Sequence, residues 1–159
     1  MMQKITPFLW FNGNAEQAAK FYTSVFRNSK MGEVRCYGDA GPGPKGSVMI
    51  ASFSIEGVEF TALNAGPQFK FNESISFVVH CKTQEEVDEY WEKLTADGGQ
   101  ESQCGWLKDK FGMSWQITPD RLLELIGDKD PGRSQRAMQA MMQMKKIDIA
   151  KIEQAANQK

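Results

Sequence analysis

The sequence has few of the residues that build disulfide-bonded or zinc-bound frameworks. Its 159 residues include three cysteines and one histidine, and the cysteines are widely spaced without a C-x-x-C pair. An odd number of scattered cysteines argues against a disulfide framework as the basis of the fold. A single histidine, His80, argues against a structural zinc site of the Cys/His type.

Long apolar runs and an excess of charge of one sign are also lacking. No run reaches the roughly 18 apolar residues of a transmembrane helix, so we expect no membrane contact. The 19 basic and 20 acidic residues give a net charge of −1, which argues against nucleic acid as a partner, because phosphate binding requires a basic surface. The N-terminal residues enter a strand-like pattern without the apolar stretch of a signal peptide. We therefore expect a cytoplasmic protein.

What is present is enough apolar sequence for a core, arranged first as one strand, one helix and three strands. The apolar fraction is 41%. The strand-like segment ITPFLWFNG ends in an Asn-Gly turn, and Asn14 is a good N-cap for the helical pattern AEQAAKFYTSVF. Three strand-like segments follow, MGEVRCYG, VMIASFSI and VEFTALNAG. A loop rich in glycine and proline, residues 39–47, separates the first two of them.

The second half repeats this order. ISFVVHC predicts a strand, Thr83 caps the helical pattern QEEVDEYWEKL, and the segment 100–119 supplies further strands and a hairpin. We expect Asp109 to hold the turn of that hairpin through hydrogen bonds from its carboxylate to the backbone. A shift of 69 residues places Phe8 on Phe77 and Tyr22 on Trp91. The sequence thus predicts two tandem β-α-β-β-β modules, each too small to bury its sheet well alone.

After Pro119 the pattern changes to helices. RLLELIGD, PGRSQRAMQAMMQM and KIDIAKIEQAANQ predict two or three helices, with Pro131 in a first helical turn. The methionines favour apolar packing, in the core or across a dimer, because methionine fills irregular gaps. Whether this tail packs within its own chain or on a partner stays open.

Several segments together resemble one family of paired-module proteins. FNGNAEQAAKFYTSVF, FNESISFVVHCKTQEEVDEYWEKL, CGWLKDKFGMSWQITP and AMQAMMQMKKIDIAKIEQA are similar to the PhnB-like branch of the vicinal oxygen chelate superfamily, often labelled 3-demethylubiquinone-9 3-methyltransferase. The superfamily includes glyoxalase I, extradiol dioxygenases and bleomycin-resistance proteins.

The resemblance implies a single α+β domain. Module one, about residues 1–68, and module two, about 69–119, would form a curved, eight-stranded mixed sheet whose concave face is a ligand cup. Helices would cover the convex face, and residues 120–159 would form a C-terminal helical tail. The resemblance also implies a homodimer.

Metal-using members of the superfamily place four ligands in the cup. The corresponding positions here, counted from the helices and turns, are Pro7, Thr61, Ser76 and Gln116. Proline has no ligand atom on its side chain, and hydroxyl groups are poor ligands for transition metals. We therefore expect no metal, and we expect no other cofactor.

We expect the cup to be lined by residues that alternate along the strands. The residues predicted to bind ligand are Leu9, Phe11, Ser76, Val78, Trp106 and Gln116. Under this alternation Phe8, Trp10, Trp115, Ile117 and Cys81 should face the helices. Gln116 can either bind a ligand through its amide or satisfy backbone groups at the strand end.

Two readings of function stay open. One is a small-molecule binding protein of the glyoxalase and bleomycin-resistance type, independent of metal. The other is an enzyme acting on a small oxygenated or aromatic metabolite, with His80 and Cys104 as weak candidates for catalysis. The methyltransferase label lacks support. Binding of S-adenosylmethionine of the common kind needs a parallel sheet with a glycine-rich turn between a strand and a helix, and the sequence shows neither. A hydrogen bond between His80 and Cys104 would favour the enzyme.

Overall fold

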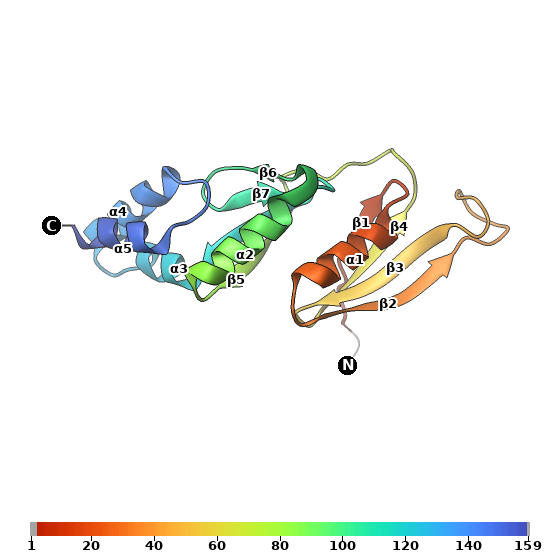
Figure 1. The fold of residues 1–159 in the computed structure, drawn as a ribbon, viewed down its shortest axis with the longest axis horizontal. Helices are drawn as coiled ribbons and strands as arrows, with labels where there is room; N and C mark the ends of the chain where they lie inside the picture. The colour runs from red at the N-terminus through yellow and green to blue at the C-terminus, as the bar shows by residue number, and fades with distance from the viewer. Residues whose placement is uncertain (1–2, 159) are drawn as a thin grey trace. The chain divides into compact units, whose positions relative to one another are not determined.

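A computed structural model describes residues 3–158, so residues 1–2 and 159 of the predicted segments lie outside the described part. The chain divides into two compact units, one ending at Phe71 and the other beginning at Asn72. Eight strands are shared between two four-stranded sheets, one in each unit (Figure 1). The two predicted β-α-β-β-β modules and the helical tail are confirmed.

Unit 1 is the first module. Its elements are β1 (Phe8–Phe11), α1 (Ala15–Val25), β2 (Ser29–Cys36), β3 (Val48–Ile55) and β4 (Val58–Asn64). The strand order is β1-β4-β3-β2, with β1 parallel to β4 and the other neighbours antiparallel. Asn14 occupies the N-cap position of α1, but its side chain makes no cap hydrogen bond. Instead, the side chain of Asn64 accepts from the backbone N–H of Ala15 at 2.9 Å, which ties the helix to β4.

The core of unit 1 lies between α1 and one face of its sheet. Tyr22 of α1 stacks on Phe53 of β3, with ring centroids 5.9 Å apart, and Phe53 stacks on Phe60 of β4 at 5.2 Å. Since side chains alternate along a strand, Ala62 shares this face with Phe60, and its parallel partner Leu9 does too. This face of the sheet is therefore the helix-covered face.

Unit 2 has the same order, followed by the tail. Its elements are β5 (Ser76–Cys81), α2 (Gln84–Thr95), the 3₁₀ turn η1 (Ala96–Gly98), β6 (Gln100–Glu101), β7 (Trp106–Lys108), β8 (Ser114–Pro119), α3 (Asp120–Ile126), α4 (Pro131–Met142) and α5 (Ile149–Asn157). The strand order is β5-β8-β7-β6, with β5 parallel to β8. The predicted cap is confirmed, because Thr83 Oγ1 accepts from the N–H of Glu86 at 3.3 Å.

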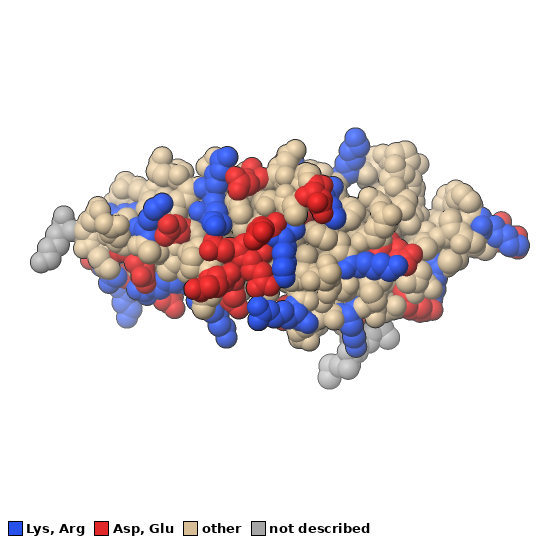
Figure 2. Space-filling model, in the orientation of Figure 1, with Lys and Arg blue, Asp and Glu red and all other residues tan. Residues whose placement is uncertain are grey.

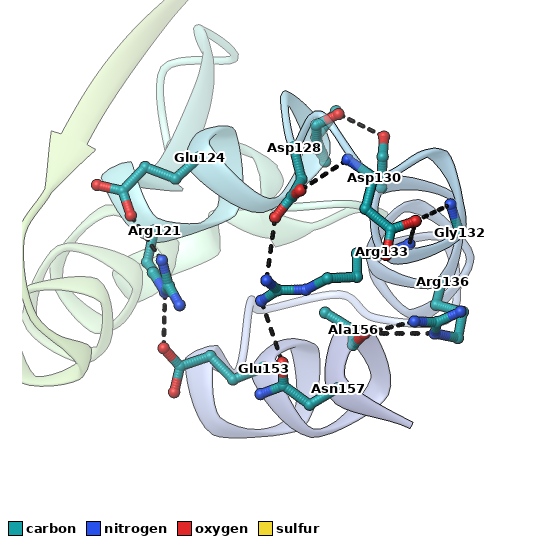
Figure 3. Close-up of polar contacts among 12 residues, drawn as sticks. Arg121, Glu124, Asp128, Asp130, Gly132, Arg133, Arg136, Glu153, Ala156 and Asn157 are labelled. Atoms are coloured by element: carbon teal, nitrogen blue, oxygen red, sulfur yellow. Dashed lines mark hydrogen bonds and ion pairs between the residues drawn. The ribbon is translucent and has the colours of Figure 1, made fainter. Parts of the chain in front are cut away.

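The tail forms a small three-helix core of its own. Its buried residues are Leu122, Leu125, Ala137, Ile147, Ile152 and Ala156. Figure 3 shows three arginines that join the helices. Arg121 bridges Glu124 and Glu153, Arg133 joins the start of α4 to the end of α5, and Arg136 donates to the carbonyl of Ala156 at 2.8 Å.

The tail packs on the second module of its own chain. Gln84 of α2 donates to the carbonyl of Ile147 at 3.0 Å and accepts from the N–H of Ile149 at 2.9 Å. The N–H of Cys104 donates to the carbonyl of Met144 at 2.8 Å. The tail therefore packs within its own chain, which is one of the two arrangements that the sequence left open.

Candidate functional site

The sheet of unit 2 presents a polar open face on the side away from α2. Trp115 and Ile117 are buried with Cys81 on the helix side, as predicted. Their neighbours along the strand therefore point to the other face. Register places Gln116 opposite both Val78 and Trp106, and Ser76 lies two residues before Val78 on the same face. Four of the six predicted ligand-binding residues thus share one surface.

Gln116 and Ser76 form the centre of this face. The amide nitrogen of Gln116 donates to the hydroxyl of Ser76 at 2.9 Å. Within residues 3–158, no hydrogen bond reaches the amide oxygen of Gln116, so this oxygen remains available as an acceptor. Val78 beside them is 45% exposed. The face therefore combines an apolar contact, an aromatic wall and a fixed amide, which suits a small organic ligand.

Leu9 and Phe11 lie on the opposite side from the one predicted. They are 7% and 3% exposed and belong to the helix-covered face of unit 1. The cause is a loop of unequal length: residues 12–14 join β1 to α1, whereas only residues 82 and 83 join β5 to α2. Because of this extra residue, the strands of the two modules overlay with a shift of 70 residues, whereas the helices overlay with a shift of 69. A change of one residue in the shift moves every side chain of a strand to the other face of the sheet.

Phe8 and Trp10, predicted to face the helices, lie on the open face of unit 1. Phe8 is 61% exposed. The indole N–H of Trp10 donates to the carbonyl of Gly66 at 2.9 Å, and its ring meets Phe69 edge-on at 4.8 Å. The open face of unit 1 is therefore aromatic at the positions where unit 2 has Val78 and His80.

The same correction moves one of the four positions tested for metal ligands. With a shift of 70, the counterpart of Ser76 is Thr6, which precedes β1, and not Pro7. The register also pairs Thr61 with Phe8 as it pairs Gln116 with Val78. Two threonines, a serine and a glutamine do not fit a transition metal, which prefers imidazole and carboxylate. Across residues 3–158 no group of three His, Cys, Asp or Glu side chains is arranged to hold a metal ion.

His80 and Cys104 do not form a catalytic pair. His80 Nδ1 lies 3.4 Å from a carboxylate oxygen of Asp120 at the start of α3. Cys104 lies in a left-handed turn with φ of 58°, held to the tail through Met144. No hydrogen bond links the two side chains in the described part of the chain. Burial, with the nearby carboxylates of Glu86 and Asp120, raises the pKa of Cys81 to about 12, so this third thiol remains protonated near neutral pH.

Three residues that the sequence analysis did not single out complete the polar face. Ser114, two residues before Gln116, is 1% exposed, and its hydroxyl has no partner among residues 3–158. Lys108 lies opposite Ser114 in the β7–β8 pair and forms an ion pair with Glu73. These residues and Trp106 line a cavity of about 160 Å³. Strand alternation from Gln116 would have indicated Ser114, but no pattern indicated Glu73, which lies before β5.

A larger cavity of about 570 Å³ lies in unit 1, under the loop rich in glycine and proline. The Tyr37 ring supports this loop, and its hydroxyl donates to the carbonyl of Asn64 at 2.5 Å. Among the described residues, its ionisable lining side chains are Tyr37 and Glu16, and Glu16 is already paired with Lys20 at 2.6 Å. We favour the smaller site in unit 2, because it brings an ammonium, carboxylates and the unpaired buried hydroxyl of Ser114 to one place.

The surface of unit 2 carries acidic side chains over α2. Figure 2 shows this red patch, which the sequence of α2 accounts for with Glu85, Glu86, Asp88, Glu89 and Glu92. An acidic helix repels phosphates, so this surface is unsuited to contact with nucleic acid. None of the helices in residues 3–158 has the length and hydropathy needed to cross a lipid bilayer.

Comparisons with known proteins agree with this architecture. The family model described as 3-demethylubiquinone-9 3-methyltransferase matches residues 3–118. No curated protein matches the chain. The match ends before α3, so the helical tail lies outside the matched region. The segment AMQAMMQMKKIDIAKIEQA, which we expected to share the resemblance, belongs to this tail.

Solved structures give the same result. The PhnB protein of Bacillus cereus, which carries the same family description, is 40% identical, with a TM-score of 0.67 over 74% of this chain and 99% of its own. Protein PA1353 from Pseudomonas aeruginosa, 20% identical, has a TM-score of 0.61 over 74% and 98%. The fosfomycin resistance protein FosX from Listeria monocytogenes, 16% identical, has a TM-score of 0.50 over 75% and 93%, and shares the fold alone. The chain therefore belongs to the 3-demethylubiquinone-9 3-methyltransferase family, the description that the PhnB protein of Bacillus cereus also carries.

Proposed function

We propose that this chain binds a small organic molecule on the open face of the unit 2 sheet. The observation that carries the proposal is the amide of Gln116, held by Ser76 at 2.9 Å with its oxygen free beside Trp106. A fixed acceptor next to an aromatic wall selects a ligand with a planar apolar part and a hydrogen-bond donor. Fold alone does not assign this role, so the proposal rests on these side chains.

Binding in this proposal is independent of a metal. The four positions that would supply ligands are Thr6, Thr61, Ser76 and Gln116, and their hydroxyl and amide groups are weak ligands. Elemental analysis of protein purified without added metal should find well under one equivalent of zinc, nickel, manganese or iron. A stoichiometric metal that a chelator removes, with loss of ligand binding, would contradict this part of the proposal.

The proposed working form is a homodimer. Phe8 exposes apolar surface on the open face of the unit 1 sheet, at 61%, and a second copy of the chain would remove that surface from water. Light scattering should give twice the mass of one chain. A mass equal to one chain at high protein concentration would contradict the dimer.

An enzyme acting on a small oxygenated or aromatic molecule is the second candidate. The contact of His80 with Asp120 at 3.4 Å favours it, because a carboxylate orients an imidazole for proton transfer. Methyl transfer is not favoured, since each sheet of the described chain is mixed and lacks the glycine-rich turn of a parallel nucleotide-binding sheet. Substrate turnover lost in His80→Ala, with ligand binding retained, would favour this second candidate.

The experiment that tests the first proposal is a thermal-shift screen of small metabolites and metals. The variants are Gln116→Ala and, as a matched control, Gln143→Ala on the exposed end of α4. Compounds that raise the melting temperature of the wild type should lose this effect in Gln116→Ala and keep it in Gln143→Ala.

Amide chemical shifts then locate the bound compound. They should change around Ser76, Trp106 and Gln116. Changes confined to the unit 1 cavity around Tyr37 and Asn64 would contradict the proposed location, as would a compound that binds Gln116→Ala as tightly as the wild type.

A further inference from the structure

The buried hydroxyl of Ser114 is the least expected feature of the open face. Ser114 is 1% exposed, and no donor or acceptor within residues 3–158 pairs with its Oγ. A buried hydroxyl without a partner costs about 1–3 kcal/mol, so native proteins keep few of them. The cavity of about 160 Å³ that Ser114 lines gives this hydroxyl a place to meet a ligand.

The second feature is a carboxylate that already occupies the same cavity. Glu73 and Lys108 both line it, and Lys108 Nζ forms an ion pair with Glu73 Oε1. A hydrogen bond from Lys108 lowers the pKa of Glu73, so this carboxyl is ionised near neutral pH. The Glu73 side chain is 62% exposed, and exposed ion pairs of this kind contribute little stability, so another carboxylate can replace it at low cost.

We propose that this cavity binds the carboxylate of a small aromatic acid, with Lys108 and Ser114 as donors and Trp106 against the ring. The ligand carboxylate takes the place of the Glu73 carboxylate and accepts a hydrogen bond from the hydroxyl of Ser114. This inference rests on the proposed function, because the same ligand extends along the open face to Gln116, two residues from Ser114.

The size and charge of the cavity favour a carboxylate over a phosphate. A volume of about 160 Å³ is close to that of a cavity known to hold one benzene ring, about 150 Å³. The lining also includes Glu101, which is paired with Lys145 at 3.8 Å, so among residues 3–158 Lys108 is the one ammonium that lines the cavity. A singly charged anion is therefore preferred to a dianion.

The test uses benzoate and its neutral isostere benzamide, with binding followed by amide and indole chemical shifts of the full chain. Lys108→Gln should weaken benzoate binding by about tenfold or more, and Ser114→Ala by about fivefold, as expected for hydrogen bonds to a charged group. Glu73→Gln should strengthen binding by about threefold, since it removes a weak competitor. Lys93→Gln on α2, another lysine paired with a glutamate, is the matched control and should change nothing.

Stability separates a binding role of Ser114 from a structural role. Ser114→Ala should leave the melting temperature of the unliganded protein unchanged or raise it, because the hydroxyl has no partner to lose. A fall of several degrees would show that the hydroxyl has a structural partner and would overturn the inference.

The remaining outcomes separate this inference from the proposed function. Equal binding of benzoate and benzamide, weaker binding by Glu73→Gln, or no saturation by benzoate would each overturn the carboxylate site. Inorganic phosphate that binds this site more tightly than benzoate, as measured by displacement of benzoate, would overturn the choice of a carboxylate. A neutral compound that still depends on Gln116 would leave the proposed function standing while this inference fails.

Discussion

The two modules share a topology and differ in the chemistry of their open faces. In each, a parallel pair of strands lies at one edge of a four-stranded sheet, β1 with β4 and β5 with β8. At matching positions the open face of unit 1 carries Phe8 opposite Thr61, and that of unit 2 carries Val78 opposite Gln116. The helix-covered faces are alike, with Tyr22 and Trp91 buried at the same point of each helix. Packing constrains one face, which leaves the other free to take up a function.

The hairpins give the largest expected difference between the modules. In unit 2 the carboxylate of Asp109, 2% exposed, accepts from the N–H groups of Phe111 and Met113 and from the indole of Trp115, at 2.8, 3.1 and 2.8 Å. Asp109→Ala leaves these donors without an acceptor and should destabilise unit 2 by about 3–5 kcal/mol. Hydrogen exchange should then speed up in β7 and β8 and not in β3 and β4.

The matched control for this prediction is Asp39→Ala in unit 1. Asp39 is exposed, and within residues 3–158 its ion pair is with Lys45, so its loss should cost under about 1 kcal/mol in urea unfolding. A loss below about 1 kcal/mol for Asp109→Ala as well would mean that water satisfies the donors of the β7–β8 hairpin, and that this hairpin does not depend on the carboxylate.

We expect low pH to weaken the packing of the helical tail on unit 2. Unit 1 has no counterpart of this tail among its described elements. Hydrogen bonds from Lys146, at 2.6 Å, and from Gln84 lower the pKa of Asp88 below its ordinary value. A carboxyl with a lowered folded pKa stabilises the fold above its unfolded pKa of about 4, and this stabilisation is lost as the pH falls through the folded value. Asp88→Asn should therefore be less stable than the wild type at pH 6, by under about 1 kcal/mol because the pair is exposed.

Melting temperatures between pH 6 and pH 3 check this sign. The gap between wild type and Asp88→Asn should narrow as the pH falls. The control is Glu16→Gln in unit 1. It removes an exposed ion pair with Lys20 that lies within one helix and does not hold the tail. A gap that stays constant to pH 3 would mean that the charge of Asp88 does not contribute to tail docking.

The sequence was sufficient to predict the element order and the helices, because amphipathic spacing and caps are local signals. VMIASFSI is β3 as predicted, and Thr83 caps α2. The parity of β5 and β8 was also predictable, since Trp115 and Ile117 are large apolar residues that alternate with polar ones. The parity of β1 was not, because the FLWF run is apolar on both faces and gives no alternation to read.

The candidate site was predictable only where it follows a strand. Gln116, Ser76 and Val78 were placed on one face from alternation, and the register confirms that arrangement. Glu73 lies in a loop whose path depends on tertiary contacts, so no sequence pattern indicated its pairing with Lys108. The same limit hid the role of Asn64 at the start of α1, since 49 residues separate the two partners.

The smallest expected effect lies in the turn that unit 1 uses instead of an aspartate. Glu56 and Gly57 join β3 to β4 with φ of 47° and 81°, so both residues of this two-residue turn lie in the left-handed region. Asparagine tolerates this conformation better than glutamate, and Asn-Gly is the preferred pair for such turns. Glu56→Asn loses one exposed contact at 3.2 Å with the N–H of Asn28, so the net gain in unfolding free energy should be about 0.5 kcal/mol.

Urea unfolding measures this gain, with Glu59→Asn on the neighbouring strand as the control that should not stabilise the protein. A loss of stability in Glu56→Asn would mean that the contact with Asn28 outweighs backbone strain, and that both hairpins rely on a carboxylate.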